Sequence, residues 1–252
     1  MKILNNKSIL VGFEDFELPE GVEVIGCNAT STEHLDKYRE MGIKVIDLKG
    51  ETKFLETITS TAEHTIGLII ALLRNYKTAL NAPYKDRDSY RGRTLSGKTI
   101  LLIGGNGRVG RQVRDRAEAF EMKVLIYEKN EPIENLYKDL EESDVASIHI
   151  PLSNNESFFS REFFSLMKPT SYLINTSRLG VVDNSALLKA LESGKIAGAA
   201  VDFIEDKKLV EYARTHNNLI LTNHQGGNTY EDRQRTEDFI IKKITDYLNE
   251  KN

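Results

Sequence analysis

The sequence predicts an α/β protein in which a doubly wound parallel sheet is joined to a second, smaller α/β domain. From residue 98 onward, short β-branched runs alternate with longer amphipathic stretches, which is typical of a parallel sheet covered by helices on both faces. A glycine-rich motif follows the first of these runs. Residues 1–77 hold a separate group of short apolar runs, which indicates the second domain.

The larger domain is expected to contain strands at 99–104, 123–128, 145–150, 171–176, 198–202 and 219–222. Helical patterns lie between them, for example at 108–120 and 184–194. The second of these helices begins behind Asp183 and ends at Gly194, which are suitable cap and stop residues. Right-handed crossovers then place a ligand site at the carboxyl ends of the strands.

The smaller domain is expected to combine both ends of the chain. Strands are predicted at 8–13, 22–27 and 43–48, and helices at 32–42, 60–82 and 230–250. Because the last helix is amphipathic, we expect it to fold back onto the first part of the chain. The predicted domains are residues 1–77 with 229–252, and residues 78–228, with a polar boundary near 82–96.

Composition excludes several classes of protein. The net charge of −4 argues against a nucleic-acid partner, because phosphate binding depends on an excess of Lys and Arg. The apolar run 65–73 is shorter than the ~20 residues of a membrane span, and the N-terminus lacks a secretory signal pattern. With one cysteine, Cys27, no internal disulfide forms, so we expect a cytoplasmic protein. The histidines show no metal-ligand spacing, and no metal is expected; His64 is interpreted as an ordinary helix residue.

The motif "GGNGRVG" at 104–110 predicts a dinucleotide site. Gly105 is expected to allow a tight turn, Gly107 to let the backbone approach a pyrophosphate, and Gly110 to pack the helix against the sheet. Glu128 ends the next strand, where a carboxylate binds ribose hydroxyls and repels a 2′-phosphate. The sequence therefore favours NAD over NADP.

A competing motif, "GRTLSGKT" at 92–99, fits the phosphate-loop pattern. That loop needs a strand before it and a helix after it, and here the order is inverted. We interpret the match as a coincidence, and a phosphate-loop NTPase as a minor alternative.

Three polar side chains lie at, or just beyond, the carboxyl ends of three predicted strands of the larger domain. Arg178, Asp202 and His224 are expected at one rim, since the carboxyl ends of parallel strands meet at one edge of the sheet. A guanidinium there can bind a carboxylate through two hydrogen bonds and polarise a neighbouring carbonyl.

With these motifs, the chain resembles the D-isomer-specific 2-hydroxyacid dehydrogenases. The resemblance runs through "TAEHTIGLIIALLRN", "LSGKTILLIGGNGRVGR", "LMKPTSYLINTSRLGVVDNSALLKALESGKIAGAAVDF" and "LTNHQGGNT", which together with shorter matches span most of the chain. It implies a Rossmann-type NAD domain, a flavodoxin-like substrate domain (here shortened), a homodimer, and a 2-oxo or 2-hydroxy acid as the small-molecule substrate.

The resemblance also implies roles for individual residues. Arg178 would bind the substrate carboxylate and carbonyl, and His224 would be the general acid/base. The substrate carboxylate would also be held by the loop residues Asn28, Ala29, Thr30 and Ser31. Expected cofactor contacts are Gly105, Gly107, Arg108, Val109, Gly110, Glu128, Pro151, Thr176, Ser177, Asp202 and Gly227.

One departure leaves an alternative open. Lys207 stands where the family has the glutamate that orients the catalytic histidine. Glu205 or Asp206 could replace it, or Asp206 could instead cap a helix that begins at Lys207. The alternative function is therefore a catalytically impaired NAD(H)-binding sensor of the same fold.

Overall fold

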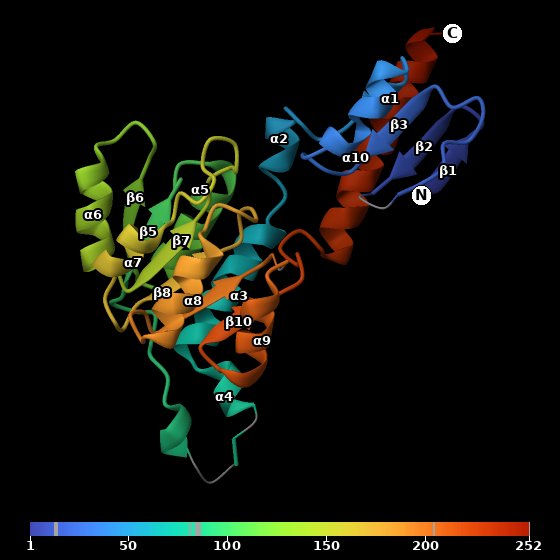
Figure 1. Ribbon diagram of the computed structural model, residues 1–252. Helices are drawn as coiled ribbons and strands as arrows, with labels where there is room; N and C mark the ends of the chain where they lie inside the picture. The colour runs from blue at the N-terminus through green and yellow to red at the C-terminus, as the bar shows by residue number, and fades with distance from the viewer. Residues whose placement is uncertain (13–14, 81, 84–86, 204, 252) are drawn as a thin grey trace. The chain divides into compact units, whose positions relative to one another are not determined.

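The computed structural model describes residues 1–12, 15–80, 82–83, 87–203 and 205–251. Parts of a predicted strand (13), a predicted helix (81) and the predicted boundary stretch (84–86) lie outside them. The chain divides into two compact units, residues 1–58 with 227–252 and residues 59–226. Figure 1 shows that each unit has a sheet with helices packed on it.

The larger unit is built on a parallel sheet in the order β10-β9-β8-β7-β5-β6. Its strands are β5 (Thr99–Ile103), β6 (Lys123–Tyr127), β7 (Val145–Ile148), β8 (Tyr172–Asn175), β9 (Gly198–Val201) and β10 (Leu219–Leu221). All of them lie where the sequence predicted strands. The chain passes from β5 to β6 and then returns to β7 on the other side of β5, so the switch point of the sheet lies between β5 and β7.

Helices cover both faces of this sheet. One face carries α3 (Ser60–Leu73) and α5 (Arg108–Ala119), and the other carries α6 (Ile133–Glu142), α7 (Arg161–Leu166), α8 (Asn184–Glu192) and α9 (Lys207–Thr215). Strand β5 serves both layers: Ile100 and Leu102 belong to the first core, and Leu101 and Ile103 to the second. From Ile100 to Ile103 the strand is apolar, which fits the burial of both of its faces.

Helix α3 explains why the units divide earlier than predicted. The sequence placed the boundaries after residues 77 and 228, whereas the structure places them after Ile58 and Gly226. The apolar face of α3, with Ile69 fully buried, packs on the larger sheet and therefore belongs to the larger unit.

The predicted helix 60–82 also ends early. Asn75 has a left-handed backbone (φ 51°), which a right-handed helix cannot continue through. In the described part of the predicted range, the short helix α4 (Tyr76–Ala79) follows it.

The smaller unit has a sheet in the order β1-β2-β3-β4. The strands are β1 (Lys2–Asn5), β2 (Ser8–Val11), β3 (Val24–Cys27) and β4 (Lys44–Ile46). β1, which the sequence analysis did not predict, pairs antiparallel with β2, and the other pairings are parallel. Helix α10 (Tyr230–Lys251) supplies Ile240 and Ile244 to the core on one face, and α1 (Asp36–Glu40) supplies Tyr38 to the other.

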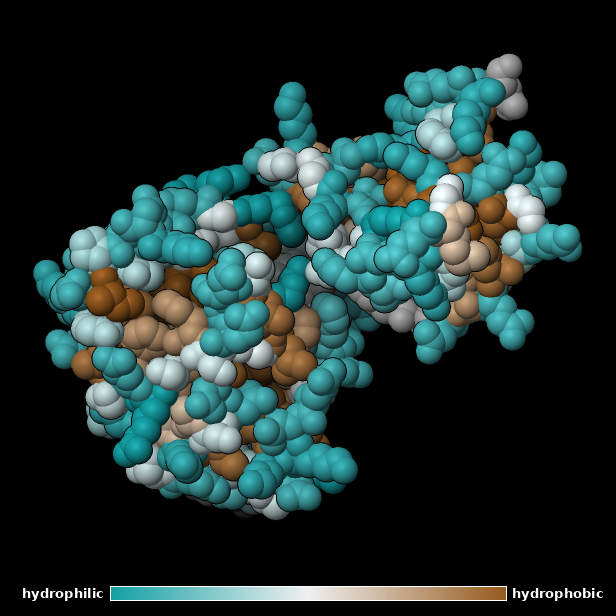
Figure 2. Space-filling model, turned by 45° about the horizontal axis from the view of Figure 1, so that its top comes forward, coloured by the Kyte–Doolittle hydropathy of each residue, from teal (hydrophilic) through white to brown (hydrophobic). Residues whose placement is uncertain are grey.

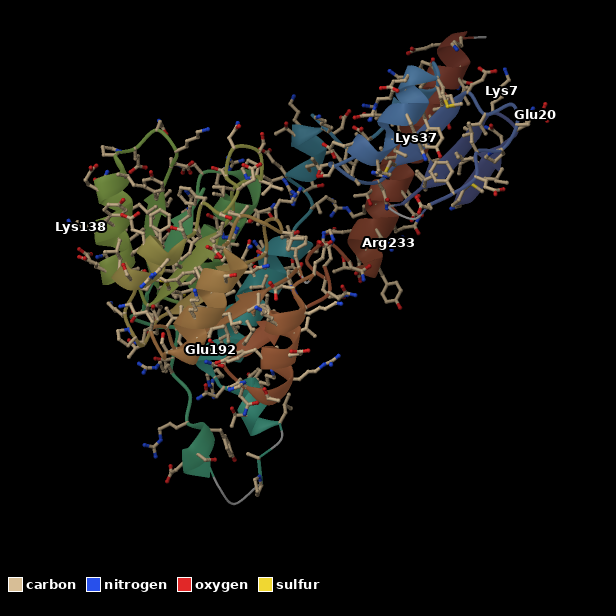
Figure 3. All side chains as sticks on the ribbon, in the orientation of Figure 1. Lys7, Glu20, Lys37, Lys138, Glu192 and Arg233 are labelled. Carbon is tan, nitrogen blue, oxygen red and sulfur yellow. The ribbon has the colours of Figure 1, made fainter. Side chains whose placement is uncertain are left out.

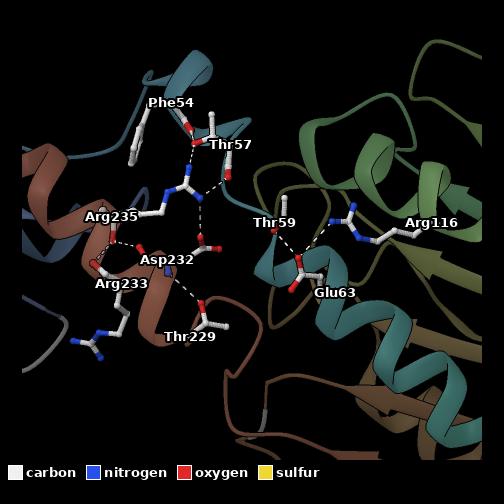
Figure 4. A network of polar contacts seen from close by, with 10 residues as sticks. Phe54, Thr57, Thr59, Glu63, Arg116, Thr229, Asp232, Arg233 and Arg235 are labelled. Atoms are coloured by element: carbon white, nitrogen blue, oxygen red, sulfur yellow. Dashed lines mark hydrogen bonds and ion pairs between the residues drawn. The ribbon is translucent and has the colours of Figure 1, made fainter.

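Polar contacts hold the chain on each side of the first passage between the units (Figure 4). Within the smaller unit, Arg235 of α10 donates to the backbone oxygen (2.8 Å) and the hydroxyl (2.7 Å) of Thr57, just after helix α2 (Thr52–Leu55). Within the larger unit, Glu63 accepts from the Thr59 hydroxyl and pairs with Arg116. Each unit therefore fixes its own end of the connection.

The visible surface is mainly hydrophilic. Figure 2 shows charged and polar side chains over most of the visible face of each unit, with hydrophobic side chains between them. Figure 3 shows labelled charges of both signs on each unit, for example Lys138 and Glu192 on the larger one. No helix in the described part of the chain is both long and apolar enough to cross a membrane.

Candidate active site

The glycine motif forms a crowded turn between β5 and α5. Gly104, one residue before the motif, has the positive φ (82°), so the tight turn lies there and not at Gly105 as predicted. A Cβ on Gly105 would lie 2.9 Å from the Ile126 side chain, and one on Gly110 would lie 2.7 Å from the Gly105 Cα. Gly107 is the N-cap of α5 and approaches the Gly104 oxygen. The glycines therefore keep the helix start close to the strand, with its first N–H groups directed outward.

Glu128 lies beside this turn. It follows β6, the neighbour of β5, and its Oε1 accepts a hydrogen bond from the Asn106 amide at 2.7 Å. The carboxylate is therefore fixed to the glycine turn, and its expected role in binding ribose hydroxyls stays a prediction. Lys129 follows directly and is exposed.

The phosphate-loop pattern at 92–99 does not have the geometry of such a loop. The short 3-10 helix Arg87–Tyr90, and not a strand, precedes it, and β5 rather than a helix follows it. Without a helix start after the lysine, its amides are not arranged around a phosphate.

Arg178 lies in a turn that Asn175 organises at the end of β8. The Asn175 side chain accepts from the amide (3.0 Å) and the hydroxyl (2.7 Å) of Ser177, and it donates to the Arg178 oxygen (3.1 Å). Arg178 is exposed, and its guanidinium donates to the Ser177 oxygen. The turn therefore presents an exposed cation at the carboxyl ends of the strands, where the sequence analysis expects a ligand site. Thr176 is buried, whereas Pro151, after β7, is exposed.

His224 lies in the loop after β10 and is also exposed. Its backbone is left-handed (φ 53°), and its ring contacts that of Phe203 at 4.5 Å between centroids. Because β8 and β10 flank β9, the ends of the strands that precede Arg178 and His224 are about 10 Å apart. The two residues therefore share one edge, as predicted.

Asp202, directly after β9, organises the His224 loop. Its carboxylate is 1% exposed and accepts from the Thr222 hydroxyl (2.6 Å) and from the amides of Gln225 (2.7 Å) and Gly226 (2.8 Å). Its backbone oxygen accepts from the His224 amide at 2.8 Å. Burial alone would raise the pKa of Asp202, but hydrogen bonds from His64, Thr222 and the two amides outweigh it, so the pKa lies below its ordinary value.

His64 is the site residue that the sequence analysis missed. Its Nε2 lies 3.3 Å from Asp202 Oδ1 and 3.2 Å from the Thr222 hydroxyl. On the next residue of α3, the Thr65 hydroxyl lies 2.8 Å from that of Thr176. The signal was present in the sequence: Thr61, His64 and Thr65 have i, i+3 and i+4 spacing, which places three polar residues on one face of an otherwise apolar helix.

The acidic residues considered as partners of His224 differ in their surroundings. Asp206 is the N-cap of α9, where one oxygen accepts from the amides of Lys208 (2.9 Å) and Leu209 (3.1 Å). This is the capping alternative considered for the sequence. Glu205 is exposed.

The loop expected to bind the substrate carboxylate follows β3 in the smaller unit. Asn28, Thr30 and Ser31 are partly accessible, and Ala29 is buried. At the end of this loop, buried Thr32 and the pair of Arg39 with Asp47 form a hydrogen-bonded cluster. The cluster fixes the end of the loop to the unit's own core.

Burial shifts the pKa of two further residues, Cys27 and His149, in the direction that favours the neutral form. Cys27 is a core residue, and burial raises the pKa of its thiol to about 11. Burial lowers the pKa of His149 to about 4, and its Nε2 lies 3.0 Å from the Ser147 hydroxyl. Among the described residues, no group of His, Cys, Asp or Glu is arranged to hold a metal ion.

Comparison with known proteins relates this chain to a family of dehydrogenases. The family described as D-isomer specific 2-hydroxyacid dehydrogenase, NAD binding domain, matches residues 66–226. The D-3-phosphoglycerate dehydrogenase of Methanocaldococcus jannaschii is 32% identical over 92% of this chain, which spans 47% of that enzyme. The hydroxypyruvate reductase of Thermotoga maritima is 31% identical over 90% of this chain and 78% of its own.

Solved structures give the same relationship. The D-lactate dehydrogenase from Aquifex aeolicus, in complex with NAD and lactic acid, has a TM-score of 0.75 and 27% identity. The similarity covers 96% of this chain and 83% of that one.

Proposed function

Because this chain belongs to the D-isomer-specific 2-hydroxyacid dehydrogenase family, whose members are NAD-binding oxidoreductases, we propose that it interconverts a 2-oxo acid and a D-2-hydroxy acid. The observation that carries the proposal is that Arg178 and His224 follow β8 and β10, at the carboxyl ends of the strands. The glycine turn follows β5 at the same edge, next to the switch point of the sheet. The cofactor is NAD in preference to NADP, because the Glu128 carboxylate is held at the glycine turn.

The residues of the glycine turn fit a dinucleotide. Side chains at Gly105, Gly107 and Gly110 would fill the space that keeps the backbone close to the strand, and the start of α5 offers N–H groups to a pyrophosphate. When the dinucleotide is bound by this turn, its nicotinamide would supply or accept a hydride. The remaining cofactor contacts belong to the same proposal: Arg108, Val109, Pro151, Thr176, Ser177, Asp202 and Gly227.

The exposed side chains of Arg178 and His224 have different chemical tasks. The Arg178 guanidinium binds the substrate carboxylate and stabilises the negative charge that develops on the carbonyl oxygen. Protonated His224 donates its proton to that oxygen during reduction, and in the reverse direction the neutral ring accepts the proton. Glu205 is proposed as the acidic neighbour of His224, since Asp206 caps α9. The amides of loop 28–31 are assigned to the substrate carboxylate, and the protein is proposed to be a cytoplasmic homodimer.

The test combines binding with turnover. We expect Arg178→Ala and His224→Ala each to lower kcat/KM with 2-oxo acids by at least about 10³-fold. NADH binding, measured by fluorescence titration, should change less than threefold, and Lys189→Ala, on α8, serves as the control. Full activity in His224→Ala would refute the assignment.

A second candidate function is an NAD(H)-binding sensor without turnover. The observation that favours it is Lys207 at the family's glutamate position, together with the use of Asp206 as a helix cap. NADH binding by the wild-type protein with no oxidation by any of a panel of 2-oxo acids would select this candidate.

A further inference from the structure

Three consecutive amides of the His224 loop converge on one residue. The amides of His224, Gln225 and Gly226 donate to the backbone oxygen, Oδ1 and Oδ2 of Asp202, respectively. The amides of Gln225 and Gly226 bind the carboxylate itself, and with the left-handed His224 before them they resemble an anion-binding nest, in which successive N–H groups face a negative charge. His224 is a left-handed residue that is not glycine, a backbone conformation that costs free energy, and the hydrogen bonds to Asp202 offset this cost. The conformation of His224 therefore depends on Asp202.

The hydrogen-bond chemistry identifies the tautomer of His64. The Thr222 hydroxyl gives its single proton to Asp202 Oδ1 at 2.6 Å, so Thr222 Oγ1 can only accept from a third group. His64 Nε2, 3.2 Å from that oxygen and 3.3 Å from Asp202 Oδ1, must therefore carry a proton. His64 thus donates one N–H toward both groups that hold the loop.

We propose that His64 is a positioning residue for the reaction: its Nε2–H, from helix α3, holds Asp202 and Thr222 in the arrangement that fixes the His224 loop. This inference rests on the proposed role of His224 as the acid/base. His64 and Asp202 are separated by most of the larger unit in sequence, and the contact joins the first turns of α3 directly to the ends of β9 and β10. Because Asp202 is buried, removing one donor leaves part of a carboxylate charge without a partner, and the loop moves to compensate.

The experiment compares side chains with and without an N–H donor. His64→Gln keeps a donor of similar reach, whereas His64→Leu keeps volume and removes the donor. His216→Leu is the matched control, because it removes an exposed imidazole at the opposite edge of the same sheet. The first readout is the NMR signal of the His224 ring in the protein without cofactor. It should shift or broaden in His64→Leu, move less in His64→Gln, and stay unchanged in His216→Leu.

The second readout is kinetic. We expect kcat to fall about 100-fold in His64→Leu, since small displacements of a catalytic group have effects of this size. The KM for NADH should change less than threefold, and His64→Gln should recover most of the lost kcat. A general loss of stability alone would not lower kcat while leaving KM unchanged, and His64→Gln would not restore the lost kcat.

The two readouts separate the two proposals. An unchanged His224 signal in His64→Leu would overturn the positioning role, even if the wild-type protein is active. A wild-type protein without turnover would overturn the proposed function, while the NMR comparison would still test the contact. If His64→Leu does not fold, Thr222→Val removes the hydroxyl between His64 and Asp202 and should disturb the same His224 signal; no change there would equally overturn the inference.

Discussion

The glycine turn after β5 and the His224 loop after β10 lie on the same edge of the same sheet, but different forces fix them. The glycine turn is fixed by the absence of side chains, because Gly105 and Gly110 bring the start of α5 against the end of β5. The His224 loop is fixed mainly by a buried charge, because the Asp202 carboxylate accepts hydrogen bonds from two of its amides and from the Thr222 hydroxyl, and the Asp202 backbone oxygen accepts from the His224 amide. The comparison teaches that a steric turn can be read from local sequence, whereas a charge-held loop depends on residues distant along the chain.

The largest expected effect breaks the glycine turn. In Gly110→Ala the new methyl group would meet backbone atoms of Gly105 at 2.7 Å, and backbone cannot move aside as a flexible side chain can. We expect a loss of about 3 kcal/mol or more in the free energy of unfolding, measured in urea, and weaker NADH binding. Gly67→Ala is the control, because it lies on an exposed part of α3 with nothing within 4 Å of the added carbon. It should instead stabilise by about 0.5–1 kcal/mol.

The second prediction uses pH to distinguish the two regions. The backbone oxygen of His149 borders the glycine turn, and burial holds the pKa of this residue at about 4 against an ordinary 6.5. Between these values the unfolded chain binds a proton that the folded chain does not, so stability is complete above pH 6.5 and falls as the pH drops toward 4. We expect about 2–3 kcal/mol of the acid-dependent loss to disappear in His149→Gln, from urea unfolding at pH 7 and pH 4.5. An unchanged loss in this variant would contradict the neutral, buried state of His149.

The smallest effect breaks the charge-held loop sterically. A Cβ on Gly226 would lie 2.9 Å from Asp202 Oδ2 and 3.4 Å from the Thr61 side chain. The carboxylate must shift, so Gly226→Ala should lower the free energy of unfolding by about 1–2 kcal/mol and disturb the NMR signal of the His224 ring. Retention of both wild-type values would mean that the loop tolerates a displaced carboxylate.

The same contrast explains how far the sequence could predict the molecule. The six strands of the larger sheet, the glycine turn and the cap at Asp183 follow from local patterns, and each was confirmed at or near its predicted place. The helix end at Asn75 and strand β1 were not predicted. Asparagine adopts the left-handed conformation more often than other non-glycine residues, but it also lies inside helices, as Asn135 does in α6, so by itself it does not mark a helix end. β1 is mostly exposed and pairs only at an edge.

The site could be predicted in its position and less completely in its contacts. Placing Arg178, Asp202 and His224 on one rim required only the parallel order of the strands. The spacing of Thr61, His64 and Thr65 marks a polar face on α3, but pairing His64 with Asp202 required the packing of α3 on the sheet. The family membership predicted from the motifs was confirmed.

Strand β1 has a consequence for handling the protein. It shields the outer border of β2, whose residues are all buried, and the pairing is irregular between Ile3 and Asn5. A bare β2 would present a row of N–H and C=O groups on which a second molecule could add a strand. Trimming residues 1–5 should therefore promote self-association, visible as larger species in light scattering, and affinity tags are better designed to leave this segment intact.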